Sequence, residues 1–291
     1  MNVLVKRINA FTDSDNGGNP AGLVLNSPNL TDKQMAYVTR TINVSETAFV
    51  FPSKKADFKN VFFTPNMEVD LCGHATIATF FIMAKLGLIK GNNKITLTQE
   101  TKTGVLPVDI HFSSKGIVEK VMMHQAKPIL KDISIDISKI ADSLKVSTKI
   151  IDDSMPHQIV STGLFTLPIC ITSFNDLKNI KPDFGKIKQL CNKIGVGSFH
   201  LFTFDTLESN SVYHARVFCP LYAVNEDPVT GTSNGAVCSY LVKNRIVDKG
   251  KIVCEQGDII GRPGRIMVEI DDDLVKVGGK AKLVEELNIS F

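Results

Sequence analysis

The sequence contains one structural pattern twice, and this duplication constrains the fold more than any other feature. In each copy an apolar stretch runs into a loop, and a glycine at the end of the loop precedes a helical pattern. The copies are residues 62–86, with Gly73 before the helix, and residues 217–244, with Gly231 before the helix. The segments that follow also match, KITLTQE at 94–100 with KIVCEQG at 251–257, and GVLPVDI at 104–110 with GRIMVEI at 264–270. The matches share an offset of about 155 to 160 positions, which indicates one duplicated unit rather than a short-period solenoid.

The start of each helix is a candidate anion site. The first N–H groups of a helix have no partner within the helix, and the macrodipole places partial positive charge there. Gly73 and His74 open the first helix, and Gly231 and Thr232 open the second. Two half-molecules that each offer such an N-terminus predict a small carboxylate held between them.

Length and composition limit the class of protein. The 291 residues, together with the duplication, predict two domains at 1–120 and 121–291, with the last strand free to pack on the first domain. The content of 43% hydrophobic and 22% charged residues is typical of a globular protein. A net charge of +3, without basic runs that interleave with aromatic residues, argues against nucleic-acid binding. The apolar runs are too short for a membrane span, so the expected partner is a small molecule.

Cysteine and histidine spacing indicates neither disulfides nor a metal. The six cysteines are scattered without a C-x-x-C pair, which is typical of reduced thiols in a cytosol. The N-terminus shows no apolar signal region, so a cytoplasmic protein is expected. The six histidines show no H-x-x-x-H or H-E-x-x-H spacing, and there is no Walker A or G-x-G-x-x-G motif that opens a helix. These spacings therefore give no support for a metal site or for a nucleotide-binding motif.

The order of elements predicts an α+β fold. Strands outnumber helices, and each half has one long helix, which favours a sheet wrapped around a central helix over a doubly wound parallel sheet. Thr31 and Gln34 have the spacing of a capping box, before a short helix that runs to about residue 41. The charged segment 131–153 is expected to be helical, with Asp136 or Ser138 as its cap.

Glu46 is the most specific single candidate for proton chemistry. It lies in an otherwise apolar strand, between Val44 and Ala48. Desolvation raises the pKa of a carboxylate in such a setting, which suits proton transfer near neutral pH. The alternative is a strand residue that faces solvent, since side chains alternate between the two faces of a strand.

His74, Asp227 and Cys72 each have both a functional and a structural interpretation. At a helix start the charged form of His74 is disfavoured, so a neutral imidazole either binds the ligand or packs and caps. Asp227 either caps the second helix or binds the substrate. A racemase with one thiol before each helix would need a second cysteine where the sequence has Thr230. Cys72 is therefore interpreted as a small buried apolar residue.

Several motifs in fixed order give the sequence a resemblance to a known family. They are NPAG at 19–22, SETAFV at 45–50, FTP at 63–65, CGHAT at 72–76, EDPVTG at 226–231 and EQG at 255–257. In this order they resemble the phenazine-biosynthesis PhzF-like proteins, over nearly the whole chain.

The resemblance implies a fold and an activity. The fold is that of diaminopimelate epimerase, in which two similar domains each wrap a β-barrel-like sheet around a central helix, with the site between them. The activity is that of a cofactor-free isomerase, usually a homodimer, in which Glu46 moves a proton between two carbons of a small carboxylate-bearing substrate. Gly73, His74, Asp227 and Gly231 would hold that substrate.

One departure from the family bears on the substrate. The family commonly has Gly-Ser-Ala where this chain has Gly231, Thr232 and Ser233. Thr232 keeps the hydroxyl for substrate binding, and its extra methyl group changes which substrate fits. Two other functions stay open on the sequence alone: an amino-acid racemase or epimerase that uses Cys72 with another partner, and a non-catalytic small-molecule binding protein.

Overall fold

The computed structural model describes residues 2–27 and 30–291, and the chain divides into two compact units. Unit 1 comprises Met1–His124 and Gly278–Phe291, and unit 2 comprises Gln125–Val277. The division falls close to the predicted boundary after residue 120. The C-terminal segment, which the prediction counted with the second domain while allowing it to pack on the first, belongs to unit 1. The reason is that the last strand pairs with the first one along almost its whole length.

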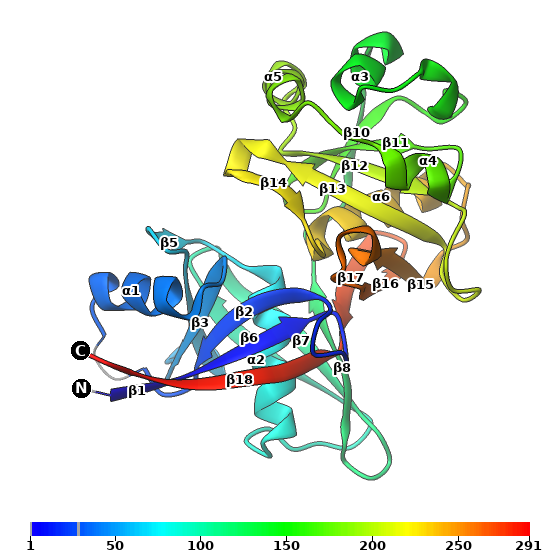
Figure 1. Ribbon diagram of the computed structural model, residues 1–291. Coiled ribbons are helices and arrows are strands. Elements are labelled where there is room, and N and C mark those ends of the chain that lie inside the picture. The colour runs from blue at the N-terminus through cyan, green and yellow to red at the C-terminus, as the bar shows by residue number, and fades with distance from the viewer. Residues whose placement is uncertain (1, 28–29) are drawn as a thin grey trace. The chain divides into compact units, whose positions relative to one another are not determined.

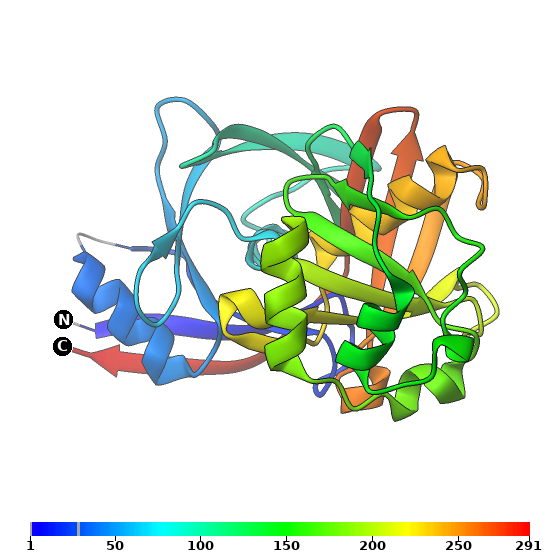
Figure 2. The same cartoon turned by 90° about the horizontal axis from the view of Figure 1, so that it is seen from above.

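Unit 1 is a curved sheet around a helix. Its elements are β1 (Asn2–Ala10), β2 (Asn19–Val24), α1 (Asp32–Ile42), β3 (Glu46–Phe51), β4 (Phe58–Phe63), β5 (Glu68–Val69), α2 (Gly73–Lys85), β6 (Lys94–Thr101), β7 (Gly104–Phe112), β8 (Val118–His124) and β18 (Ala281–Ser290). The sheet order is β18–β1–β2–β3–β4–β6–β7–β8, with β5 beside β4. The pairs β2/β3 and β4/β6 are parallel, and the other pairs are antiparallel. Both views show β1 and β18 side by side (Figures 1 and 2).

Helix α2 is the central helix of unit 1. Every residue from Ala75 to Ala84 is buried, as expected for a helix that is apolar on all sides. The outer face of the sheet carries α1, which begins with the predicted capping box of Thr31 and Gln34. Buried residues of α1, among them Val38, pack with strand residues such as Phe49. Strand β3 therefore lies between two apolar layers.

Unit 2 repeats this architecture. Its elements are β9 (Ile129–Asp132), α3 (Ile137–Leu144), β10 (Gln158–Ser161), β11 (Phe165–Cys170), α4 (Phe174–Asn179), α5 (Phe184–Ile194), β12 (Ser198–Thr203), β13 (Tyr213–Cys219), β14 (Val224–Asp227), α6 (Gly231–Lys243), β15 (Gly250–Gln256), β16 (Gly264–Asp271) and most of β17 (Leu274–Gly279), with 3-10 turns at Thr148–Ile150, Pro220–Tyr222 and Asp258–Ile260. The last two residues of β17 belong to unit 1. The sheet order is β9–β10–β11–β12–β13–β15–β16, with β14 beside β13. In Figure 1, α3 and α5 lie on one side of the strands β11–β13, and α6 lies on the other side.

The duplication extends to strand direction and to single residues. Strands β1 to β7 and strands β10 to β16 follow the same succession of antiparallel and parallel pairs. Helices α1 and α5 both end at a left-handed residue, Asn43 or Gly195, and the next strand starts three positions later, at Glu46 or Ser198. The central helices α2 and α6 are both 13 residues long. The α+β class, with a sheet wrapped around a central helix, is confirmed.

The prediction of a helix over 131–153 is mostly wrong. Only α3 is α-helical in this segment, and the Asp136 side chain caps it. The preceding residues alternate in character, because Ile133, Ile135 and Ile137 all pack against the unit 2 core. This period of two is typical of extended chain, and β9 pairs with β10 immediately before it. No helix in the described parts of the chain is long and apolar enough to cross a membrane.

Candidate active site

Glu46 stands at the first position of β3, between the sheet and the start of α2. Since side chains alternate along a strand, Phe49 points into the layer beneath α1 and Glu46 points to the opposite face. Its carboxylate oxygen Oε2 lies 3.3 Å from His74 Nε2. The side chain is only 23% exposed, so it is not the fully solvated strand residue of the alternative interpretation.

Cys72 and His74 complete a cluster with Glu46. Cys72 is the extended N-cap residue of α2, and His74 is the second residue of the helix. The Cys72 thiol lies 3.5 Å from His74 Nδ1 and 3.8 Å from His74 Nε2. One ligand atom from each of the three residues lies within 4.8 Å of the other two. Cys72 is buried, as predicted, but it faces an imidazole and not only apolar atoms, so the interpretation as a small apolar residue is incomplete.

The start of α2 is a candidate place for a ligand, because its N-cap residue, Cys72, makes no side-chain capping bond. A buried amide fixes the position of the first turn instead. Thr76 donates to the Cys72 carbonyl at 2.8 Å and contacts Gln99 of β6. Asn60 donates to Gln99 Oε1 at 2.8 Å. The helix start is thus fixed from the sheet side, and the N–H groups of Gly73 and His74 open the helix next to Glu46.

In unit 2 a denser network fixes the start of α6. Gln256 Oε1 accepts hydrogen bonds from the Thr230 backbone N–H at 3.1 Å and from Asn234 Nδ2 at 2.7 Å. Gln256 Nε2 donates to the Asp227 carbonyl at 2.8 Å. Tyr213, which is fully buried, donates to Asn234 Oδ1 at 2.8 Å. Gln256 corresponds to Gln99 in the repeat, so both units use a strand glutamine for the same purpose.

Asp227, Gly231 and Thr232 lie together at this second helix start. Thr230, not Asp227, is the N-cap residue, and α6 has no side-chain cap. Thr230 Oγ1 donates to Asp227 Oδ2 at 2.5 Å, so the prediction that Asp227 simply caps the helix is wrong. Gly231 and Thr232 are the first two residues of α6, and both are half-buried. The Thr232 carbonyl accepts a hydrogen bond from the Thr162 hydroxyl at 3.2 Å.

Of the predicted site residues, the structure therefore brings Glu46, Gly73 and His74 together in unit 1, and Asp227, Gly231 and Thr232 together in unit 2. The contact between Cys72 and His74 was not predicted, although the Cys-x-His spacing at a helix start was visible in the sequence. The roles of Gln99 and Gln256 were not predicted either, although the two residues occupy matching positions in the duplicated segments.

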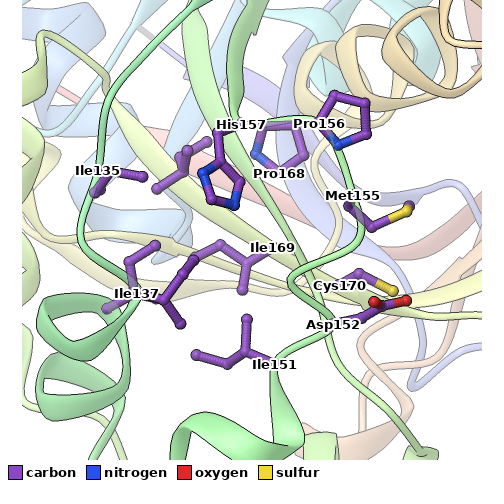
Figure 3. Close-up of a pocket in the computed structure, with 12 residues that line it drawn as sticks. Ile135, Ile137, Ile151, Asp152, Met155, Pro156, His157, Pro168, Ile169 and Cys170 are labelled. Atoms are coloured by element: carbon purple, nitrogen blue, oxygen red, sulfur yellow. The ribbon is translucent and has the colours of Figure 1, made fainter.

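A separate pocket in unit 2 does not qualify as a substrate site. Aliphatic side chains such as Ile135, Ile151 and Ile169 line it, with Asp152 and His157 among the polar residues (Figure 3). Its volume of about 20 Å³ is room for about one water molecule. Burial also raises the pKa of Cys170, which lines this pocket, to about 12, so the thiol stays protonated at neutral pH.

Comparison with known structures defines the class of protein. A crystal structure of a PhzF-family phenazine biosynthesis protein from Bacillus anthracis superposes with a TM-score of 0.91 at 30% identity, over 100% of both chains. A hydroxyproline epimerase from Agrobacterium vitis, solved with bound trans-4-hydroxy-L-proline, has a TM-score of 0.63 at 11% identity over 99% of this chain and 91% of that one, which shows a shared fold. The fold is thus that of the diaminopimelate-epimerase-like isomerases and epimerases.

Sequence comparison then gives the family. The model of the phenazine biosynthesis-like proteins, PhzC-PhzF, matches residues 8–286. The uncharacterized isomerase YfhB of Bacillus subtilis is 33% identical over 96% of this chain and 93% of its own length. An uncharacterized isomerase of Clostridium acetobutylicum is 35% identical over 96% and 95%. The chain belongs to the PhzC-PhzF phenazine biosynthesis-like family, and it is an isomerase of that family.

Proposed function

We propose that the protein is a cofactor-independent isomerase that moves a proton between two carbons of a small carboxylate-bearing substrate, with Glu46 as its single acid and base. The observation that carries this proposal is the position of the Glu46 carboxylate, 3.3 Å from His74 at the uncapped start of α2. The carboxylate takes a proton from one carbon as the C–H bond breaks. The carboxyl group then returns a proton to a second carbon as the double bond shifts, so the net charge of the substrate stays unchanged. While the carboxyl group holds the proton, part of it exchanges with water, so solvent hydrogen also enters the product.

The helix start supplies the binding side of the proposal. A substrate carboxylate at the N–H groups of Gly73 and His74 gains from both hydrogen bonds and the helix dipole, an effect of up to about 2 kcal/mol in a partly buried setting. His74 lies between the Glu46 carboxylate and the Cys72 thiol and donates or accepts one further directional bond. Asp227, Gly231 and Thr232 are proposed to bind polar groups of the substrate, and Thr232 to restrict its size.

Solvent exchange tests this function across a range of candidate substrates. A panel of small amino, hydroxy and unsaturated carboxylates is incubated with the protein in D₂O, and mass spectrometry follows deuterium at carbon. We expect at least one compound to isomerise and to gain deuterium with the native protein, and none to do so with Glu46→Gln, which keeps the shape and removes the proton carrier. Ser198→Ala, at the equivalent strand position of unit 2, is the control that should retain activity. Turnover that persists in Glu46→Gln would contradict the assignment.

The assembly is proposed separately. We expect a homodimer, and light scattering coupled to size-exclusion chromatography measures the mass directly. A species of the monomer mass at micromolar concentration would contradict this expectation.

A further inference from the structure

Glu46, Cys72 and His74 together offer one oxygen, one sulfur and one nitrogen donor. Within residues 2–27 and 30–291 they are the one group of three potential metal ligands whose donor atoms lie this close to one another. We propose that this group is a Zn²⁺ site, and that a zinc ion bound there inhibits the enzyme. The binding rests on the cluster alone, whereas the inhibition rests on the proposed role of Glu46.

Two separations between donor atoms are close to those of a tetrahedral zinc site. Bond lengths of about 2.3 Å to sulfur and about 2.0–2.1 Å to nitrogen or oxygen place tetrahedral S and N ligands about 3.6 Å apart and N and O ligands about 3.3 Å apart. The structure has 3.8 Å from Cys72 Sγ to His74 Nε2 and 3.3 Å from His74 Nε2 to Glu46 Oε2, but Sγ is closer still to His74 Nδ1, at 3.5 Å. The thiol therefore lies beside the imidazole ring and not ahead of its Nε2 lone pair, so ion binding requires the His74 ring or the Cys72 side chain to rotate.

The type and number of donors also suit zinc. Three protein ligands drawn from Cys, His and carboxylate leave a fourth position for water or another small ligand, as in catalytic zinc sites. Mg²⁺ and Ca²⁺ prefer oxygen ligands, so the thiol and the imidazole select against them. Cys72 is buried, and the side chains of His74 and Glu46 are 13% and 23% exposed, so the cluster is shielded but an ion can still reach it.

The helix dipole opposes a cation at this place, but its effect is small. The partial positive charge at a helix N-terminus disfavours a nearby cation only weakly. Coordination by a thiolate and an imidazole is much stronger, so coordination outweighs the dipole.

Other potential metal ligands among the described residues form poorer sites. The pair His124 and Asp109 approaches to 3.3 Å and the pair His214 and Glu255 to 2.9 Å, and neither belongs to a three-ligand group with a thiol. Burial raises the pKa of Cys191 to about 12, which disfavours the thiolate that a metal needs. The cluster of Glu46, Cys72 and His74 should therefore bind the first equivalent of metal.

A bound ion would prevent the proposed reaction. Coordination occupies the Glu46 lone pair that accepts the substrate proton, and it fixes His74 and places a positive charge where the proton must arrive. Zinc is therefore expected to reduce kcat, and a chelator is expected to restore it.

Spectroscopy with Co²⁺ as a zinc substitute tests the binding without any activity assay. We expect one equivalent of Co²⁺ to produce a thiolate-to-cobalt charge-transfer band, which one equivalent of Zn²⁺ abolishes. In competition with a chromophoric chelator, Cys72→Ser should lose the band and bind Zn²⁺ at least about 100-fold more weakly, and Glu46→Gln and His74→Asn should also bind more weakly. His124→Asn, in the other imidazole–carboxylate pair of unit 1, should bind like the native protein.

Two results would overturn the proposal: no charge-transfer band, or a Zn²⁺ affinity that Cys72→Ser leaves unchanged. Circular dichroism of each variant shows whether it is folded, and if Cys72→Ser is not, Cys72→Ala replaces it. Binding without inhibition would overturn the inhibitory role and leave the site intact. Binding by a protein that shows no isomerase activity on any panel compound would show that the proposed function fails while the metal site stands.

Discussion

Unit 1 and unit 2 place side chains at three equivalent positions around the start of their central helices: the first residue of a strand, the helix N-cap and the second helical residue. In unit 1 these positions hold three groups able to take part in proton transfer, and in unit 2 they hold three hydroxyls. The pairs are Glu46 and Ser198, Cys72 and Thr230, and His74 and Thr232. The surroundings are similar, since neither N-cap residue makes a side-chain capping bond and a strand glutamine contacts the start of each helix.

The difference between the two sets of side chains indicates which unit can carry out proton transfer and which can only bind. A hydroxyl of serine or threonine does not titrate near neutral pH, so it cannot serve as a base without help, whereas a carboxylate can. Hydroxyls at an open helix start still donate and accept hydrogen bonds. Proton transfer is therefore expected to depend on unit 1, and unit 2 is expected to contribute to binding through Asp227 and Thr232.

The largest expected effect is at the strand position. Glu46→Gln should lower kcat by about 10²- to 10⁴-fold, the range for removal of a general acid–base group. Ser198→Ala should stay close to the native kcat, because the Ser198 hydroxyl is buried and bonds to Thr166. Steady-state kinetics on the compound that the exchange panel identifies measures both. An equal loss in the two variants would mean that the units share the proton chemistry.

The second helical position should show a smaller contrast. His74→Asn removes the imidazole that lies 3.3 Å from the Glu46 carboxylate and the hydrogen bond that we propose it makes to the substrate. A bond to a charged group contributes about 1.5–3 kcal/mol, so kcat/KM should fall about 10- to 100-fold. Thr232→Val keeps the volume and removes only a hydroxyl, so KM should rise up to about tenfold while kcat is kept. A fall in kcat for Thr232→Val would place unit 2 in the chemical step.

A third contrast concerns stability and pH. His200 of β12 takes the place of Ala48 in β3, and complete burial lowers its pKa to about 3, although it bonds to Ser233 of α6 at 2.8 Å. The unfolded chain binds a proton below the ordinary pKa of about 6.5 and the folded chain does not, so stability falls as the pH falls through this range. The loss is about 1.4 kcal/mol per pH unit, or about 2 kcal/mol between pH 7 and pH 5.

Urea unfolding at pH 7 and pH 5 measures this loss. His200→Gln should show a smaller change between the two pH values than the native protein, because it cannot titrate. His157→Gln, at a more exposed histidine paired with Asp153, is the matched control and should keep most of the native change. An identical change in all three proteins would show that His200 is not responsible.

The smallest expected effect is at the N-cap. Cys72→Ser should change kcat by less than about tenfold, because a neutral hydrogen bond contributes about 0.5–1.5 kcal/mol and the thiol is not the proposed acid or base. The same variant should lose zinc inhibition. A large loss of solvent exchange at an α-carbon with Cys72→Ser would instead favour the amino-acid epimerase, in which the thiol carries a proton.

The repeated architecture could be predicted because it depends on local pattern. The glycines that open α2 and α6, the apolar runs within the helices and the capping box at Thr31 are all visible in stretches of neighbouring residues. The wrong helix prediction at 131–153 also came from local pattern. The charged residues of this segment suggested a helix, whereas isoleucines at alternate positions indicated extended chain.

The site could be predicted only in part because its contacts cross the sheet. Glu46 and His74 meet because β3 and the start of α2 pack on one side of unit 1, and no local pattern contains that contact. Motifs for metal ligands describe spacings within one helix or loop. They therefore do not detect a group in which Glu46 comes from one element and Cys72 and His74 from another. Likewise, the equivalence of Glu46 and Ser198 became clear only from the matching ends of α1 and α5.

A label-transfer experiment tests most directly the central claim that one carboxylate carries the proton. The substrate is prepared with deuterium at the carbon that loses its proton, and the product of a single turnover in H₂O is analysed by mass spectrometry. A single base that removes and returns the same proton should leave part of the deuterium at the new carbon. A product free of substrate-derived deuterium from the first turnover would show that the group that removes the proton does not return it, and it would contradict the account.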